Sequence, residues 1–466
     1  MEFVTVAAAS LPSVPLDFQG NRDRILESIK IAKQKGATLR TGPELEIPGY
    51  GCLDHHLEND TEFHSWEVLA EIISDPVCKD MLIDLGMGVR HRNVQFNCRV
   101  LCTYRKIYAI RAKQTLAGDG LYREPRHFTA WVKERQVENY KLQQVVRQVT
   151  NQTTVPIGDF ILETPDTSVT CETCEELVSS SRTSNYIVLL TAVFKFVPRN
   201  PSIFAGLSGA EIVLNSSASH AELRKLGRRL NLISNSTRSN GGLYVYANST
   251  GIDGDARILY DGSSMIIQNG EVLAQSSQFS LLPVEVIVAT VDLGKVRSYR
   301  ASHSRSVQAA AQPEFPRVDC DIMLSRLSSE LFFSEGGISP EIPIKFLEPM
   351  EEINLATAVF LWQYLVRSSS PGFFLALSGG LDSSTVALFV LGMCKLVLKS
   401  IQNGEETTLR DLRKAVGIKD YTPKSAEDIV SKILHTCFMG TVNSSEETRS
   451  SMLSSSIISD TIQAEY

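Results

Sequence analysis

The stretch Phe373-Phe-Leu-Ala-Leu-Ser-Gly-Gly-Leu-Asp-Ser-Ser384 decides how the last part of this chain folds. Its apolar start predicts a buried strand, and the pattern from Thr385 to Leu398 predicts a helix. A glycine turn between them would present the unpaired N–H groups and positive end of a helix to an anion. The glycines let the backbone approach a phosphate closely, and Asp382 can hold a metal ion that bridges phosphates. The stretch therefore predicts nucleotide binding.

The spacing of this loop is not that of a P-loop, because no Gly-Lys-Ser/Thr follows the glycines. It resembles the Ser-Gly-Gly-x-Asp-Ser loop of ATP pyrophosphatases, which adenylate a carbonyl oxygen and release pyrophosphate. The resemblance implies ATP and Mg²⁺ as co-substrate and ion, with Asp382 as the metal ligand. The residues that would bind them are Ser378, Gly379, Gly380, Asp382 and Ser383. A Ser/Gly-rich turn without a ligand is the alternative.

Composition limits the class of protein. The chain has 466 residues, a net charge of −7 and 43% hydrophobic residues, which fits two or three soluble domains. The mild acidity gives no sign of nucleic-acid binding, and no run approaches the ~20 apolar residues that cross a bilayer. The N-terminus lacks the pattern of a secretory signal, and nine scattered cysteines are typical of reduced thiols. We expect a cytoplasmic protein without nucleic-acid or membrane partners.

The pattern of turns and apolar segments predicts two α/β units. Residues 1–300 are expected to form one domain, in which short turns such as Tyr104-Arg-Lys106 and Asn269-Gly270 predict antiparallel pairs within a mixed sheet. Residues 301–348 are rich in Ser, Pro and charge and lack a clear period, so we interpret them as a linker. Residues 349–466 begin a second α/β unit, which is short for a complete doubly wound nucleotide domain.

Three segments of the first domain carry the residue types that cleave an amide with a thiol. They are Gly42-Pro-Glu-Leu-Glu-Ile-Pro48, Ile110-Arg-Ala-Lys-Gln-Thr115 and Glu172-Thr-Cys-Glu-Glu-Leu177. Cys174 would supply the nucleophile, and the ammonium of Lys113 would lower the pKa of the thiol and stabilise the oxyanion. Glu44 would take the thiol proton and later activate water. Whether the three meet in space does not follow from the sequence.

Each of these residues also has a simpler interpretation. Glu44 could lie at the surface at a strand end, and Lys113 could be solvated, as most lysines are. Cys174 forms a Cys-x-x-Cys pair with Cys171, which suggests zinc or redox chemistry. No second pair with zinc-type spacing occurs, so a metal site is the weaker interpretation.

The three segments resemble the Glu-Lys-Cys triad of the nitrilase superfamily. The closer similarity is to the glutaminase domain of the eukaryotic-type glutamine-dependent NAD synthetases, and it extends to His91–Arg99, Tyr122–Phe128 and Asn215–His220. The Ser378 loop follows in the order of that family. The resemblance implies a nitrilase-like α-β-β-α sandwich, followed by a Rossmann-like ATP-pyrophosphatase domain of the adenine nucleotide alpha hydrolase type.

The family's chemistry implies roles for further residues. Cys174, Lys113 and Glu44 would hydrolyse the side-chain amide of glutamine, and Glu124 would orient the substrate or the lysine. Ser217, Ser219 and Arg224 would bind the α-carboxylate and amine of glutamine, because an arginine fork suits a carboxylate. The ammonia would amidate deamido-NAD to NAD in the ATP-dependent second domain. The family also implies a homo-oligomer.

Two features depart from the family pattern. Residues 178–195 are about eighteen more than the family has at this point, and they begin only four residues after Cys174. Their composition matches neither flank, so we interpret them as an insertion that arose as an artefact of splicing or of the gene model. After Arg449 the sequence no longer follows the family, so we expect a truncated second domain with an incomplete nucleotide site.

Two other functions remain open at this point. One is a nitrilase-type glutaminase or amidase with an inactive synthetase remnant. The other is a non-catalytic interaction subunit in which both sites have decayed. A different ATP-pyrophosphatase amidotransferase, such as a GMP synthetase, is disfavoured because those enzymes lack a Glu-Lys-Cys first domain.

Overall fold

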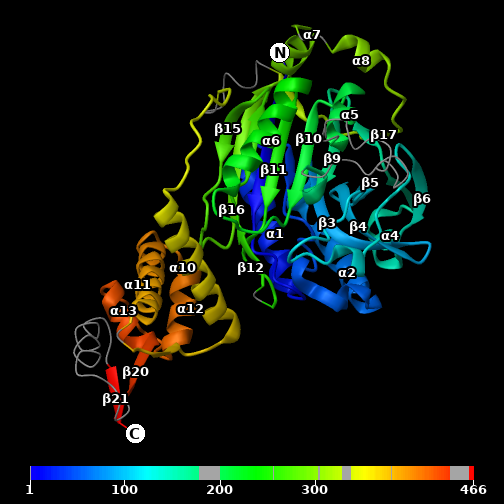
Figure 1. Ribbon diagram of the computed structural model, residues 1–466. Coiled ribbons are helices and arrows are strands. Elements are labelled where there is room, and N and C mark those ends of the chain that lie inside the picture. Colours follow the sequence, from blue (N-terminus) through cyan, green and yellow to red (C-terminus); the bar gives the residue numbers. More distant parts are fainter. Residues whose placement is uncertain are drawn as a thin grey trace, which may run out of the picture. The chain divides into compact units, whose positions relative to one another are not determined.

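The structure is a computed structural model that describes residues 2–177, 200–255, 257–302, 305–327, 337–378, 380–440 and 461–465. The chain divides into two compact units (Figure 1). The first comprises residues 1–278 and 284–346, and the second comprises residues 279–283 and 347–466. The expected insertion at 178–195 lies outside the described residues, as does Gly379.

Two mixed β-sheets form the centre of the first unit. The strands of one sheet lie in the order β16 (Glu285–Asp292), β1 (Glu2–Ser10), β2 (Leu39–Thr41), β3 (Leu82–His91), β4 (Val94–Thr103), β5 (Lys106–Ala112), β7 (Thr154–Gly158) and β6 (Val137–Lys141). Those of the other lie in the order β15 (Glu271–Gln275), β14 (Met265–Gln268), β11 (Leu243–Asn248), β10 (Ile212–Ser217), β9 (Ser168–Thr173), β8 (Ile161–Glu163) and β17 (Arg317–Asp319). Both predicted hairpins are confirmed, because β4–β5 and β14–β15 are antiparallel pairs.

Helices cover the outer face of each sheet. α1 (Phe18–Gln34) and α2 (Asn59–Ser74) pack on the first sheet, and α5 (Pro201–Leu207) and α6 (Lys225–Asn240) pack on the second (Figure 1). Side chains of β1 alternate between the layers, so Ala7 packs with Trp66 of α2 while Val6 packs between the sheets with Leu214. The predicted α-β-β-α sandwich is confirmed, with one core between the sheets and one beneath each helical layer.

Shorter elements complete the first unit. They are η1 (Tyr50–Leu57), η2 (Pro76–Cys78), α3 (Glu124–His127), α4 (Gln144–Thr150), η3 (Cys174–Leu177), β12 (Thr250–Ile252), β13 (Leu259–Asp261), α7 (Leu293–Ser302), α8 (Ser306–Ala310) and β18 (Ser325–Leu327).

Part of the predicted linker belongs to the sheets of the first unit. β17 pairs in parallel with β8, and β18 pairs with β1 in antiparallel orientation. The hydroxyl of Thr38 also donates to the carbonyl of Leu324 at 2.6 Å. The interpretation of 301–348 as a linker is therefore wrong for this part, because strands of three residues are too short to show a period in the sequence.

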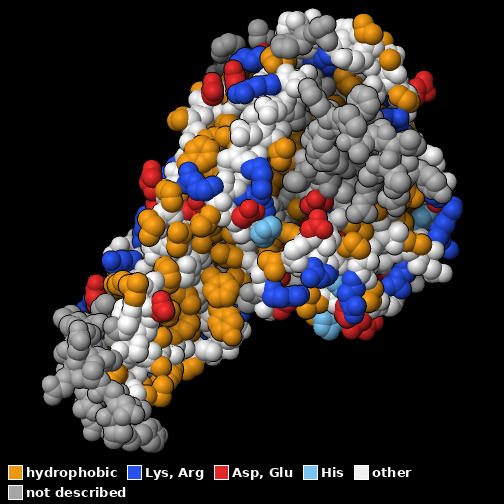
Figure 2. All heavy atoms as spheres, in the orientation of Figure 1, with side chains coloured by type: hydrophobic (Ala, Val, Ile, Leu, Met, Phe, Trp, Pro, Cys, Tyr) orange, Lys and Arg blue, Asp and Glu red, His pale blue; other side chains and the backbone are white. Residues whose placement is uncertain are grey.

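The second unit combines helices with a small parallel sheet. Its elements are α10 (Pro349–Ser368), β19 (Phe373–Ala376), α11 (Leu381–Gln402), α12 (Glu406–Val416), α13 (Ala426–Ile433), β20 (Leu434–Gly440) and β21 (Thr461–Glu465), with the strands in the order β19-β20-β21. The predicted strand and helix around the Ser378 loop are thus present as β19 and α11. Large apolar side chains remain exposed on this unit, among them Met350, Phe374 and Leu381 (Figure 2).

The helix α11 is the one described helix that is long and apolar enough to cross a membrane by length and composition. The mean hydropathy of its most apolar window is 1.7, although Asp382 and Lys395 interrupt the apolar run in the sequence. Core helices of soluble proteins meet the same criterion, and Val390 and Met393 of α11 lie in the core of the second unit. A single helix of this kind is weak support for a membrane span.

All nine cysteines lie in the described part of the chain, and each is a buried free thiol. Cys171 packs between the two sheets, whereas Cys174 begins η3. Among the described residues, no group of three or more His, Cys, Asp or Glu side chains could hold a metal ion.

We expect the substitution Leu214→Ala to destabilise the first unit by about 2–5 kcal/mol, because it opens a cavity between the two sheets. Leu214 is fully buried there. Thermal denaturation monitored by circular dichroism measures the effect. The matched substitution Leu223→Ala, at a leucine that is 54% exposed, should change stability by less than about 0.5 kcal/mol. Equal midpoints for the two variants would contradict the layer arrangement.

Candidate active site

Glu44 lies just after β2, and its carboxylate is fully buried. The side-chain amide of Asn97 on β4 donates to Glu44 Oε1 at 2.7 Å, and the backbone N–H of Ala218 donates to Oε2 at 3.3 Å. The backbone of the next residue, Leu45, has a φ of 49°. A leucine in the left-handed region is strained, and such strain is typical of functional sites.

Lys113 follows the end of β5 and is also buried. Its Nζ lies 2.6 Å from Glu44 Oε1 and 2.8 Å from Glu124 Oε1. Burial alone would lower the pKa of Lys113, but the two carboxylates outweigh it and hold the pKa above its ordinary value. Lys113 is therefore an ammonium at neutral pH, as its predicted role requires.

Glu124 is the first residue of the short helix α3 and shares Lys113 with Glu44. The hydroxyl of Tyr50 donates to Glu124 Oε1 at 2.7 Å, and the backbone N–H of Ala117 donates to Oε2 at 3.1 Å. Burial raises the pKa of Glu124 to about 7, against the lowering effect of Lys113. This carboxyl can therefore gain or lose a proton near neutral pH.

Cys174 stands at the junction between β9 and η3 with a φ of 45°, a second strained position in the site. Its thiol interacts electrostatically with Glu44, Lys113 and Glu124, and the backbone N–H of Ala218 hydrogen-bonds to it. Burial raises the pKa of the Cys174 thiol well above its usual range, Glu44 raises it further, and Lys113 lowers it. The resting thiol is therefore protonated and needs a base before it can attack a substrate.

The structure thus brings together Glu44, Lys113 and Cys174 from three distant segments of the chain. The backbone N–H of Ala218 reaches both Glu44 and Cys174. Ala218, Asn97 and Tyr50 were not predicted as site residues. Asn97 and Ala218 lie within stretches that resemble the family, but a backbone N–H or a single supporting side-chain contact cannot be recognised from residue type.

A cavity of about 500 Å³ opens beside Cys174. Its walls include Tyr122, Ser217, Ser219, His220, Tyr246, three cations of α6 (Lys225, Arg228 and Arg229) and two carboxylates (Asp119 and Glu175). Ser217 and Ser219 therefore line it as the sequence predicts. The cations and carboxylates give the cavity both signs of charge, which suits a zwitterionic amino acid.

Arg224, the predicted carboxylate ligand, does not line this cavity. It is an exposed residue that precedes α6 in the left-handed conformation, with a φ of 65°. Lys225 and Arg229 lie four residues apart and so share a face of α6, and both line the cavity. Arg224 and Arg228 are also four residues apart, and Arg228 lines the cavity, so this spacing alone could not have separated Lys225 from Arg224.

The cations of α6 are themselves held in place. Arg229 forms a buried ion pair with Asp261 at 3.1 Å, and its guanidinium lies 5.2 Å from the centre of the Tyr246 ring. Lys225 Nζ donates to the carbonyl of His220 at 3.0 Å. Burial lowers the pKa of Lys225, and the neighbouring Arg229 lowers it further. An anionic ligand would favour the charged form of Lys225.

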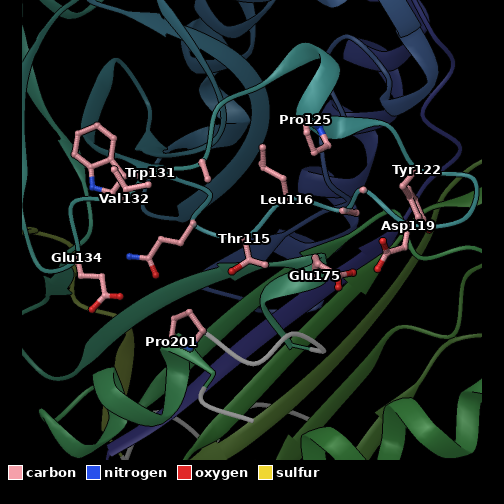
Figure 3. Close-up of a pocket in the computed structure, with 14 residues that line it drawn as sticks. Thr115, Leu116, Asp119, Tyr122, Pro125, Trp131, Val132, Glu134, Glu175 and Pro201 are labelled. Carbon is pink, nitrogen blue, oxygen red and sulfur yellow. The ribbon is translucent and has the colours of Figure 1, made fainter. Parts of the chain in front are cut away.

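A second cavity, of about 520 Å³, shares Asp119, Tyr122 and Glu175 with the first. Figure 3 shows the carboxylates of Asp119 and Glu175 gathered beside Tyr122, with Trp131 and Glu134 at the far end and Pro201 of α5 along one side. The two cavities therefore meet at the two carboxylates that lie near Cys174.

The Ser378 loop of the second unit exposes hydroxyl groups at the N-terminus of α11. Ser378 and Ser383 hydroxyls lie 3.1 Å apart, and the backbone N–H of Gly380 donates to Ser378 Oγ at 3.3 Å. Asp382 is exposed in the first turn of the helix. Hydroxyls and a helix N-terminus fit a phosphate, and one carboxylate fits Mg²⁺, which takes its other ligands from water and phosphates.

A family model for carbon-nitrogen hydrolases matches residues 5–185 and 195–301. The chain belongs to the carbon-nitrogen hydrolase family. The match omits residues 186–194, which fall within the segment that we expected to be an insertion.

This family member is 48% identical to the glutamine-dependent NAD(+) synthetase of Saccharomyces cerevisiae and 46% identical to that of Homo sapiens. Each alignment covers 96% of this chain and 60% of the relative. The chain therefore spans about three-fifths of the length of the curated relatives that it matches. The resemblance predicted from the sequence is confirmed.

Two solved structures share the fold of this chain. The glutamine-dependent NAD(+) synthetase from Cytophaga hutchinsonii matches with a TM-score of 0.72 at 25% identity, over 99% of this chain and 65% of that one. The enzyme from Acinetobacter baumannii, solved with adenosine diphosphate, has a TM-score of 0.65 at 16% identity, over 99% of this chain and 65% of that one.

We expect the first unit to lose stability as the pH falls from about 6.5 to about 4, in part because of His56. Burial lowers the pKa of His56 to about 4, although its bond to the Tyr50 carbonyl at 3.1 Å opposes this. Between these two pH values the imidazole is protonated in the unfolded chain but stays neutral in the folded chain. The free energy of unfolding therefore falls as the pH is lowered through this window, by roughly 2–3 kcal/mol in all.

The variant His56→Gln should therefore show a flatter dependence of its melting midpoint on pH between 4 and 7. His64→Gln, at a histidine whose side chain is 51% exposed, serves as the matched control and should keep the slope of the parent. A His56→Gln variant that keeps that slope would contradict the assignment.

Proposed function

We propose that the first unit hydrolyses the side-chain amide of glutamine, with Cys174 as nucleophile, Glu44 as base and Lys113 as the stabilising cation. The observation that carries the proposal is that Glu44 and Lys113 are in direct contact and interact electrostatically with Cys174 beside a cavity with both signs of charge. Membership of the carbon-nitrogen hydrolase family supports the same chemistry.

The first half of the reaction transfers a proton and forms a thioester. Glu44 takes the proton of the Cys174 thiol, and the thiolate attacks the amide carbon of glutamine. The negative charge on the carbonyl oxygen develops beside the Lys113 ammonium, which is already in place and needs no reorganisation. Glu44 then returns the proton to the leaving nitrogen, so ammonia departs and a glutamyl thioester remains.

The second half restores the enzyme. Glu44, ionised again, takes a proton from water, and the hydroxide attacks the thioester carbon beside Lys113. The thiolate leaves and regains its proton from Glu44, which releases glutamate. Glu124 positions Lys113 in both halves, because it is the second carboxylate in contact with Nζ.

We further propose that the whole protein is a glutamine-dependent NAD synthetase, in which this ammonia amidates deamido-NAD to NAD. The relatives support this, together with the Ser378 loop. Ser378, Gly380, Asp382 and Ser383, with Gly379, would hold the phosphates of ATP and its Mg²⁺, and ATP would supply the adenylyl group that activates the nicotinate carboxylate. A homo-oligomer in a reducing cytoplasm is part of the same proposal.

The variant Cys174→Ala should release no glutamate from glutamine, because it removes the nucleophile. Glutamate is measured with a coupled glutamate dehydrogenase assay. Cys171→Ala is the matched control: Cys171 lies three residues away but packs between the sheets, so this variant should keep activity within about threefold. Glutamate release from Cys174→Ala at the rate of the parent would contradict the glutaminase proposal.

Supplying glutamine, ATP and deamido-NAD, and measuring glutamate and NAD separately, distinguishes the synthetase from its rivals. The synthetase proposal expects both products. Glutamate without NAD would favour an amidase with an inactive remnant, and neither product would favour a non-catalytic subunit. In the presence of ammonium chloride, Cys174→Ala should still form NAD.

The variant Lys225→Met should raise the KM for glutamine roughly 10- to 100-fold and change kcat by less than about threefold. The reason is that a charge-assisted bond to the α-carboxylate contributes about 1.5–3 kcal/mol. Steady-state glutamate release measures both constants. Lys30→Met, at an exposed lysine of α1, is the control. A rise in KM for Arg224→Met but not for Lys225→Met would contradict this assignment and favour Arg224, the residue predicted from the sequence, as the ligand of the α-carboxylate.

A further inference from the structure

Four buried charged side chains form a cluster around the turn that carries Glu44, and they do not line the cavity. It consists of Arg40, Glu46, Asp84 and Arg99, and every member has a side chain that is at most 1% exposed. None of them lines the cavity beside Cys174. The glutamine chemistry therefore does not by itself explain why these charges are buried.

Arg99 connects this cluster to the backbone that carries Glu44. Its Nη1 donates to the carbonyl of Pro43 at 2.8 Å, and its Nη2 donates to the carbonyl of Gly42 at 3.3 Å. Its Nε donates to Asp84 Oδ1 at 2.9 Å. The guanidinium thus holds the two peptide groups that immediately precede the proposed base.

Arg40 holds the other end of the same turn. Its two terminal nitrogens each lie 2.8 Å from a carboxylate oxygen of Glu46, two residues after Glu44. The turn is strained between these anchors, because Leu45 has a φ of 49°. Two forked guanidinium contacts therefore fix a backbone that would otherwise relax.

Asp84 links the cluster to the strand that supports the thiol. Its Oδ2 accepts from Thr41 Oγ1 at 2.6 Å and from Ser216 Oγ at 3.2 Å. Ser216 lies on β10, two residues before Ala218, whose N–H contacts both Glu44 and Cys174. The cluster thereby fixes Glu44 relative to the strand end that also meets the nucleophile.

The neighbouring strand leaves space for this arrangement. A Cβ on Gly86 of β3 would lie 2.2 Å from Arg99 Nη1 and 2.6 Å from the backbone nitrogen of Leu45. A side chain there would displace both the guanidinium and the turn. Glycine at this position is what lets the arginine reach the carbonyls before Glu44.

We propose that Arg99, oriented by Asp84, is a positioning residue that fixes Glu44 for proton transfer with Cys174. This inference rests on the proposed glutaminase function of the same site. Arg99 acts through Glu44 and does not touch the substrate. If the ion pair of Arg99 and Asp84 were purely structural, changing it would alter the stability of the fold but not the proton transfer by Glu44. Buried ion pairs often add little net stability, so stability alone does not explain why this pair is present.

The test is a double-mutant cycle in the full chain with Arg99→Lys, Glu44→Gln and both together. Lysine keeps the charge at position 99 but cannot form the fork. The first readout is the rate at which iodoacetamide alkylates Cys174, followed by mass spectrometry of its peptide, which does not depend on glutamine turnover. The second readout is kcat and KM for glutamate release.

We expect Arg99→Lys to slow alkylation of Cys174 about 10-fold or more and to lower kcat 10- to 100-fold, with KM changed less than about threefold, because small displacements of a catalytic group have large effects on rate. In the Glu44→Gln background the same substitution should change alkylation less than about twofold, because the group through which Arg99 acts is gone.

Arg300→Lys is the matched control. Arg300 also donates in a fork to backbone carbonyls, those of Gly241 and Gly209, but none of its hydrogen bonds involves a residue of the proposed site. Its substitution should leave the alkylation rate within about twofold. Thr41→Val removes one donor to Asp84 without changing any charge, and it replaces Arg99→Lys in the cycle if that variant does not fold.

Three results would overturn the proposal. The first is an equal slowing by Arg99→Lys in both backgrounds, and the second is no slowing in the parent. The third is an alkylation rate of Cys174 that Glu44→Gln leaves unchanged or raises, because Glu44 would then not act as the base that ionises the thiol. A parent that is alkylated in the expected pattern but releases no glutamate would instead refute the glutaminase function and leave the positioning role standing.

Discussion

The candidate site depends on one buried ammonium shared between two buried carboxylates. Lys113 lies within 2.8 Å of both Glu44 and Glu124, and all three side chains are withdrawn from water. Removing one partner from such a group costs about 3–5 kcal/mol, because it leaves an uncompensated charge in a medium that solvates it poorly. The three side chains therefore depend on one another, and the fold must place all three within contact distance at once. β2 and β5 run in the same direction within one sheet, so Glu44 and Lys113, which follow them, leave the sheet at the same edge.

This electrostatic arrangement explains why the thiol does not need to be ionised at rest. The negative charge of Glu44 and burial both oppose a thiolate at Cys174, and Lys113 favours it. Ionisation can then accompany proton transfer to Glu44 itself, which removes the opposing charge at the moment the thiolate forms. Two left-handed positions, at Leu45 directly after the base and at Cys174 itself, lie in the site and cost about 1–3 kcal/mol of backbone strain each.

Three short motifs, taken together with the family resemblance, predicted Glu44, Lys113 and Cys174 as one site, and the structure places Glu44 and Lys113 in contact. The hairpins followed from turns such as Asn269-Gly270, whose residues adopt positive φ as a tight hairpin requires. The sandwich followed from the family resemblance, since strand patterning alone predicted only a mixed sheet. β17 and β18 could not be recognised, since three residues carry no period. That Lys225 lines the cavity and Arg224 does not could not be predicted, because it depends on where α6 begins and on how that helix packs on its sheet.

The distribution of the site over the chain separates the two chemistries. Every residue proposed for glutamine hydrolysis lies in the first unit, and the supporting cluster around Arg99 lies there as well. The Ser378 loop lies in the second unit. The geometry of the thiol, the ammonium and the carboxylates therefore does not depend on whether the nucleotide site is complete. A loss of NAD formation with glutamate release intact would localise a defect to the second unit, and the reverse would localise it to the first.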